Sequence, residues 1–138
     1  MATTAEAVTP TQDLEARGRV FINSVTYDPA GSDTGTNAHV NKEIVRITNS
    51  TNKRRSLRGW TLRDRGSIHV HRFPRTALRP GRTVKVHTGR GRDRGLQRYW
   101  DLGFYVWNNT GDKAILRNRA GRVIDTCSWG DGDGTAGC

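Results

Sequence analysis

Residues 43–64, EIVRITNSTNKRRSLRGWTLRD, decide the fold of this chain because they place two short apolar runs on either side of a polar, basic segment. Successive side chains point to opposite faces of a β-strand, so Val45 and Ile47 share one face while Arg46 and Thr48 share the other. The segment between the runs has no helical pattern. The stretch therefore predicts a strand, a loop and a second strand.

The Gly59–Trp60 pair opens the second run and indicates a core anchor. Glycine lets the backbone bend, and the indole beside it buries a large apolar area. With the inward positions of the two runs and two later strands, this predicts a core set. Its members are Val45, Ile47, Trp60, Leu62, Trp107 and Leu116.

The rest of the chain predicts further short strands, with none of the periodicity of a helix. Residues 19–27 form the first, with a bulge near Asn23. Strands at 67–73, 83–88 and 113–117 follow, and the aromatic residues 104–107 are predicted to form a hairpin across 108–111. A meander of antiparallel strands accounts for this pattern most simply.

Six short motifs, taken in order, resemble the lamin-tail domain. They are EIVRITN at 43–49, LRGWTLRD at 57–64, LRPGRTV at 78–84, VWNN at 106–109, GD at 111–112, and Leu116 followed by GRVID at 121–125. The resemblance implies an all-β fold, an immunoglobulin-like β-sandwich, over residues 19–138 with a glycine-rich C-terminal tail. It implies no single function.

Composition agrees with one small domain. The 138 residues bury a single core, and no apolar run approaches the length of a transmembrane span.

Residues 1–18 are predicted to be a flexible leader. They lack the basic and apolar regions of a secretory signal, so either the protein is not exported or the sequence begins after a removed signal.

The basic charge is concentrated in the middle of the chain. Residues 51–98 contain fifteen Lys and Arg and two Asp, a net charge of +13, whereas the remainder has eight basic and eleven acidic residues, −3. Arginine suits bidentate phosphate contacts, so this segment predicts polyanion binding, with a merely solvated surface as the alternative. The candidates are Lys53, Arg54, Arg55, Arg58, Arg90, Arg92, Arg94 and Arg98. Arg90, Arg92 and Arg94 belong to a Gly/Arg-rich stretch, residues 89–95, that is predicted to be a mobile loop, and Arg98 follows it.

The sequence supports two metal-binding hypotheses less strongly than it supports polyanion binding. The long loop at 28–43 gathers the oxygen-bearing side chains of Asp28, Asp33 and Glu43, which makes them Ca²⁺ candidates, although solvated turns are the commoner use of such residues. His69 and His71 are two residues apart on one predicted strand, so they project from the same face and could share a metal ion. No third ligand is evident in the sequence.

Cys127 and Cys138 bracket the glycine-rich tail. A disulfide between them would hold this tail in place and would indicate an oxidising compartment, and two free cytosolic thiols are the alternative. We favour the bridge.

No catalytic or cofactor-binding motif is found, so we expect a non-enzymatic module without a cofactor. Because the bacterial lamin-tail domains look like modules of exported proteins, the first hypothesis is a monomeric, secreted or cell-surface module that docks a protein or cell-envelope component. The alternatives are a binder of nucleic acid or acidic polysaccharide and a Ca²⁺-stabilised extracellular module.

Overall fold

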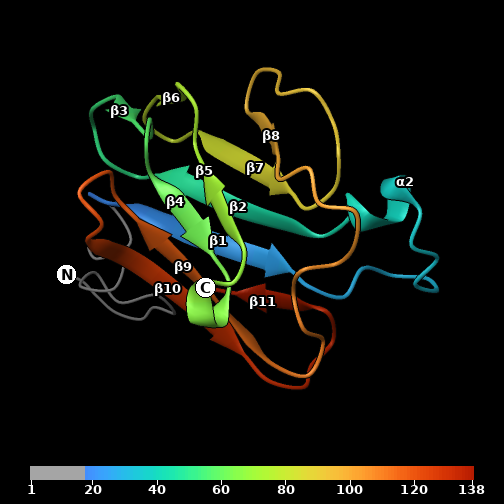
Figure 1. Ribbon diagram of the computed structural model, residues 1–138. Coiled ribbons are helices and arrows are strands. Elements are labelled where there is room, and N and C mark those ends of the chain that lie inside the picture. Colours follow the sequence, from blue (N-terminus) through green and yellow to red (C-terminus); the bar gives the residue numbers. More distant parts are fainter. Residues whose placement is uncertain (1–17) are drawn as a thin grey trace.

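The computed structural model describes residues 18–138, which form two facing β-sheets (Figure 1). The leader predicted for residues 1–18 lies almost wholly outside the described residues. The elements are β1 (Val20–Thr26), α2 (Asn37–Val40), β2 (Ile44–Asn49), β3 (Arg55–Ser56), β4 (Thr61–Arg63), η1 (Arg65–Ser67), β5 (Val70–Arg72), β6 (Ala77–Leu78), β7 (Thr83–His87), β8 (Gln97–Tyr99), β9 (Asp112–Arg117), β10 (Val123–Trp129) and β11 (Thr135–Gly137).

One sheet has the strand order β11-β1-β2-β7-β8, and the other has the order β10-β9-β4-β5. Strands β3 and β6 form a separate two-stranded ribbon. The all-β prediction is therefore confirmed, but a simple antiparallel meander is wrong, because β8 pairs with β7 in parallel. Strand β2 lies in one sheet and β4 in the other, so residues 43–64 cross between the two layers.

The core lies between the sheets and is built mainly from the inward residues of the longer strands. Val45, Ile47, Leu62 and Leu116 are fully buried, and Trp107 is nearly so. Trp60 differs from the prediction, because it is only partly buried and packs against the core from its margin.

A turn explains the position of Trp60. The Trp60 N–H donates to the carbonyl oxygen of Leu57 at 2.9 Å, and Gly59 between them has a φ of +80°. Strand β4 begins only after this turn, which leaves the indole at the rim. Leu57, fully buried, takes the interior position instead.

The predicted bulge in β1 is confirmed, and it joins the two sheets. The register of β1 against β2 shifts between Ile22 and Ser24. The N–H of Ile22 donates to Oδ2 of Asp125 in β10 at 2.8 Å, which satisfies a main-chain group beside the irregular position.

The aromatic segment before β9 is not a strand, so the predicted hairpin at 108–111 is wrong. Residues 100–107 instead run irregularly past α2 (Figure 1). The buried side chains of Trp100 and Trp107 hold this segment against the core. Carboxylates take the place of a partner strand, because Val106 N–H donates to Glu43 and Asn108 N–H to Asp112.

The loop at 28–43 contains a helical turn, α2, that the sequence analysis missed. Thr36 caps it by accepting a hydrogen bond from His39 N–H at 3.3 Å. The buried His39 ring contacts the Tyr105 hydroxyl through Nδ1 at 2.6 Å and the Ala30 carbonyl through Nε2 at 3.0 Å. The turn thus anchors the loop to the irregular segment at 100–107.

The predicted disulfide between Cys127 and Cys138 is confirmed. Cys127 belongs to β10, and Cys138 directly follows β11, so the bond joins the edges of the two sheets. Strand β11 itself is only three residues long and pairs with β1. A bond of this kind restricts the unfolded chain and holds a short strand that has few contacts of its own.

We expect Cys138→Ser to lower the free energy of unfolding by about 3 kcal/mol, the chain-entropy value for a loop of this length. Urea denaturation of the variant and of the wild type, oxidised and reduced, measures this difference. Reduced wild type should match the variant. Equal stability of the oxidised and reduced wild type would contradict the prediction.

Candidate functional site

Ten of the exposed basic residues lie on two segments. Lys53, Arg54, Arg55 and Arg58 lie in and beside β3, and all four are exposed. Strand β3 pairs with β6, whose flanking residues include further exposed arginines, namely Arg75, Arg79 and Arg82. The second segment is the loop at 89–95, in which Arg90, Arg92 and Arg94 are exposed.

Asn49 holds the first segment in place. Its Nδ2 donates to the carbonyl oxygens of Lys53 at 2.8 Å and Leu78 at 2.7 Å. Its Oδ1 accepts from the N–H and the hydroxyl of Thr51 at 2.9 and 2.7 Å. Asn49 is fully buried, so one amide satisfies polar groups from β6 and from the segment that leads into β3. The sequence analysis missed this residue, although an Asn before a Ser-Thr pair is typical of a turn.

The 89–95 loop is irregular, as predicted, but hydrogen bonds hold it in place. The Arg90 carbonyl accepts from Nδ2 of Asn37 at 2.9 Å and of Asn41 at 3.0 Å, and Arg90 N–H donates to Oδ1 of Asn37 at 2.7 Å. A Cβ on Gly91 would lie 2.5 Å from the Tyr99 ring, so only glycine fits there. The arginines of a loop described as mobile in the sequence analysis are therefore presented from a fixed backbone.

Arg98 was predicted to bind a polyanion, and this prediction is wrong. Its side chain is buried, with 7% of the residue exposed. Its Nε donates to the Thr76 hydroxyl at 3.0 Å, and its Nη1 donates to the carbonyls of Gly95 at 2.8 Å and Gln97 at 2.9 Å. Thr76 precedes β6, and Gly95 ends the Gly/Arg-rich loop. Arg98 thus links the two basic segments instead of contacting a ligand.

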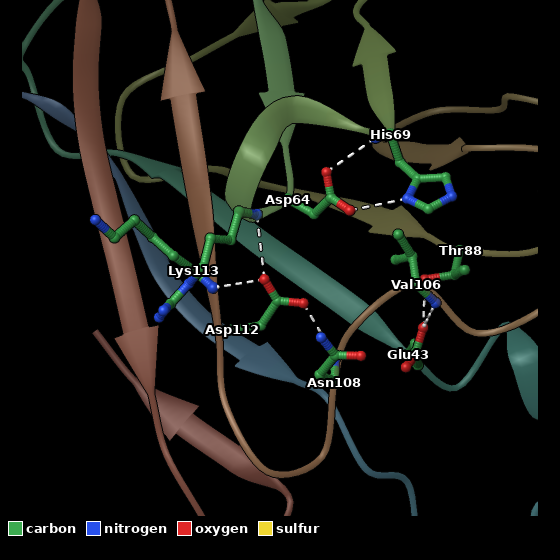
Figure 2. Close-up of polar contacts among 9 residues, drawn as sticks. Glu43, Asp64, His69, Thr88, Val106, Asn108, Asp112 and Lys113 are labelled. Carbon is green, nitrogen blue, oxygen red and sulfur yellow. Dashed lines mark hydrogen bonds and ion pairs between the residues drawn. The ribbon is translucent and has the colours of Figure 1, made fainter.

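The two acidic residues of the basic middle each accept a hydrogen bond from within the fold, but only Asp64 is buried. Asp64 is buried and accepts from the N–H of His69 at 2.9 Å, and its other oxygen lies 2.8 Å from His69 Nδ1 (Figure 2). Asp93 accepts from Tyr99 N–H at 3.0 Å and faces Nε of Arg98 at 4.0 Å. The side chain of Asp93 is 39% exposed, so it offsets one of the three arginine charges of the second segment, and both segments keep a net positive charge. We call these segments, residues 53–58 with 75–82 and residues 90–94, the basic surface.

A hollow of about 530 Å³ adjoins the second segment. Arg92, Arg94, Gln97 and Tyr99 contribute to its lining, and Tyr99 stacks on His87 with ring centroids 4.8 Å apart. Guanidinium groups beside a hollow can bind phosphate, sulfate or carboxylate groups of a ligand.

The Ca²⁺ hypothesis fails on geometry. Glu43 is buried, and its Oε1 accepts from the Thr88 hydroxyl at 3.0 Å and from Val106 N–H at 2.9 Å (Figure 2). It is therefore not available to a cation beside Asp28 and Asp33. Across residues 18–138, no group of three or more His, Cys, Asp or Glu side chains could hold a metal ion.

The two histidines of the 67–73 stretch likewise have separate roles. His69 pairs with Asp64 (Figure 2). His71 is buried against Phe73 and Trp100, and this burial lowers its pKa from 6.5 to about 4. His71 is therefore neutral at physiological pH and part of the core.

A family model described as the Lamin Tail Domain matches residues 14–131. The chain belongs to the lamin-tail domain family. No curated protein matches the sequence at a significant level. Lamin-tail domains have an immunoglobulin-like fold and are in general interaction modules without catalytic activity. Within the described part of this lamin-tail domain, no helix is long and apolar enough to span a membrane.

We expect Asn49→Ala to lower the free energy of unfolding by about 3 kcal/mol, because it removes a buried amide that makes four hydrogen bonds, among them the buried one to the Leu78 carbonyl. Asn52→Ala is the matched control, since Asn52 is exposed three residues away. The control should change stability by less than about 0.5 kcal/mol. Denaturant titration of both variants measures their free energies of unfolding. Equal losses of stability in the two variants would contradict the role given to Asn49.

The pKa of Glu43 gives a prediction of pH dependence. Burial raises this pKa from 4.5 to about 7, against the opposing effect of its hydrogen bonds to Val106 and Thr88. Between these two pH values the folded protein keeps a proton that the unfolded chain has released. The stability contribution from Glu43 is therefore present below pH 4.5 and lost as the pH rises through 7.

We expect Glu43→Gln to remove this pH dependence while keeping an oxygen that accepts both hydrogen bonds. From pH 5 to pH 8 the wild type should lose stability relative to the variant, by on the order of 3 kcal/mol at most. Thermal and urea unfolding across this range measure the difference. Asp133→Asn, at an exposed carboxylate, is the control. Parallel profiles for wild type and Glu43→Gln would contradict the prediction.

Proposed function

We propose that this lamin-tail domain is a non-catalytic binding module that engages a polyanion through the basic surface. The observation that carries the proposal is the role of Arg98, which ties the β6 segment to the Gly/Arg-rich loop. Two clusters of arginines that are distant in sequence are thereby held together on a fixed backbone. A fixed array of cations binds an anionic chain with a smaller loss of side-chain and loop entropy than a flexible one.

Nucleic acid and acidic polysaccharide share the chemistry that this surface recognises. Both are chains of repeated anionic groups, and arginine binds phosphate, sulfate or carboxylate through paired hydrogen bonds. Neither the ribbon nor the loop offers a helix or long strand that could enter a nucleic-acid groove. Contact with the backbone of the polymer, without sequence preference, is the mode that fits these segments.

We also propose that the module works outside the reducing interior of the cell, on a secreted protein or at the cell surface. The disulfide between Cys127 and Cys138 supports this proposal, because such bonds persist in oxidising compartments. Docking of a protein or cell-envelope component, and a monomeric state, remain predictions from the sequence.

The test measures binding of a duplex DNA and of a sulfated polysaccharide at several salt concentrations. Binding should weaken steeply with salt, because each neutralised phosphate releases counterions. We expect Arg92→Ser with Arg94→Ser to reduce the slope of log K against log salt for the duplex by up to about 1.8, or about 0.9 for each charge removed. Arg54→Ser with Arg58→Ser should act similarly.

The matched control is Lys113→Ser with Arg122→Ser, which removes two charges from β9 and from the turn between β9 and β10. It should leave the slope nearly unchanged. If the control pair lowers affinity as much as the test pairs, only the net charge matters and the basic surface is not the site. Binding that is insensitive to salt would overturn the proposal altogether.

A further inference from the structure

Strand β5 forms an open edge of the four-stranded sheet. The strand order β10-β9-β4-β5 places it last, and among the described residues its only strand partner is β4. An edge of this kind presents a row of main-chain donors and acceptors to which another chain can pair. None of the β5 residues belongs to the basic surface defined above.

The hydrogen bonds at either end of β5 show which of its main-chain groups face outward. Phe73 N–H donates to the Trp60 carbonyl at 2.8 Å, and Asp64 N–H donates to the His69 carbonyl at 3.4 Å. Alternate residues of an antiparallel strand bond to the same neighbour, so residues 69, 71 and 73 face β4. Val70 and Arg72 therefore direct their N–H and C=O groups to the open edge.

Apolar side chains accompany these outward main-chain groups. Ile68 is 78% exposed and Val70 is 40% exposed, and they are two of the four large hydrophobic residues exposed in the described chain. Ile68 ends the η1 turn, in contrast to the strand predicted for it. An added strand would cover both side chains and remove their apolar surface from water.

The charge around this edge is positive. Arg65 and Arg72 are exposed and Arg63 is half-buried on the neighbouring strand β4. The nearest carboxylate in the sequence, Asp64, is buried and held by His69. Opposite charges on directly paired strands stabilise a sheet, and like charges destabilise it. A second copy of β5 would bring arginines together, whereas an acidic strand would complement them.

We propose that the edge of β5 is a docking site for an extended acidic peptide segment of a partner protein. The segment adds a fifth strand, pairs with the main-chain groups of Val70 and Arg72, and covers Ile68 and Val70. Main-chain hydrogen bonds provide the affinity, and the alternating side chains of the peptide provide the specificity. This site gives the module a protein partner in addition to a polyanion.

The test uses a fluorescent peptide with alternating glutamate and valine residues, blocked at both ends. Two further versions carry N-methyl groups, one on the valines and the other on the glutamates. The N–H groups of alternate residues lie on the same side of a strand, so only one version loses the donors that face β5. We expect one methylated peptide to bind about tenfold more weakly or worse, and the other to bind like the parent.

Two variants of the protein locate the site. Val70→Pro removes an outward N–H that the fold does not use, and Ile68→Ser with Val70→Thr removes the apolar contact without changing the backbone. Each should weaken binding of the parent peptide by about tenfold. Circular dichroism and thermal unfolding check that the variants fold. If Val70→Pro does not fold, the double variant still tests the apolar contact and the methylated peptides still test the main-chain pairing.

Three outcomes would overturn the proposal. These are equal binding of the two methylated peptides, unchanged binding by the folded variants, and no binding of the parent peptide at millimolar concentration. Arg92→Ser with Arg94→Ser should leave peptide binding unchanged, which separates this site from the basic surface. A reduced salt slope for polyanion binding in that pair, together with unchanged peptide binding, would support both sites independently.

Discussion

Every buried main-chain N–H and C=O group needs a hydrogen-bond partner, and this requirement shapes the parts of the structure that strand pairing does not reach. Four buried side chains provide hydrogen-bond partners for main-chain groups in these parts. Glu43 and Asp112 accept from the irregular 100–108 segment, Asn49 binds the ribbon carbonyls, and Arg98 binds the carbonyls at the end of the Gly/Arg-rich loop. Because these contacts are internal, long connections of this small sandwich have defined positions.

The same internal contacts leave the surface charge unbalanced. Asp64 is buried against His69, and Asp93 is the one acidic residue within the two basic segments, so their arginines have few acidic neighbours to neutralise them. The fold thereby supplies two different surfaces for binding. One is a fixed array of cations on the ribbon and loop, and the other is the open edge of β5 with its exposed apolar side chains. Neither needs a catalytic group, which agrees with the interaction role of lamin-tail domains.

Sequence patterns predicted the features that depend on neighbouring residues along the chain. Alternation identified the buried faces of β2 and β9, and crowding of apolar residues located the bulge in β1. The same reasoning failed where a residue distant in sequence determines the local conformation or the burial of a side chain. The aromatic run before β9 has strand propensity, yet Glu43 takes its main-chain N–H and no strand forms. Arg98 looks like its exposed neighbours in the sequence, and only its contacts with Thr76 and Gly95 distinguish it.

The amino-acid sequence by itself determined that the chain is a β-sandwich of the lamin-tail type with a basic middle and two cysteines on either side of a glycine-rich tail. These properties follow from alternation, composition and motif order, all of which are local or additive. The tertiary structure alone decided which arginines reach solvent, that Trp60 stands at the rim, and which main-chain groups of β5 lie open. These depend on residues far apart in sequence that compete for the same buried hydrogen bonds and interior volume, and no short window of sequence contains both competitors.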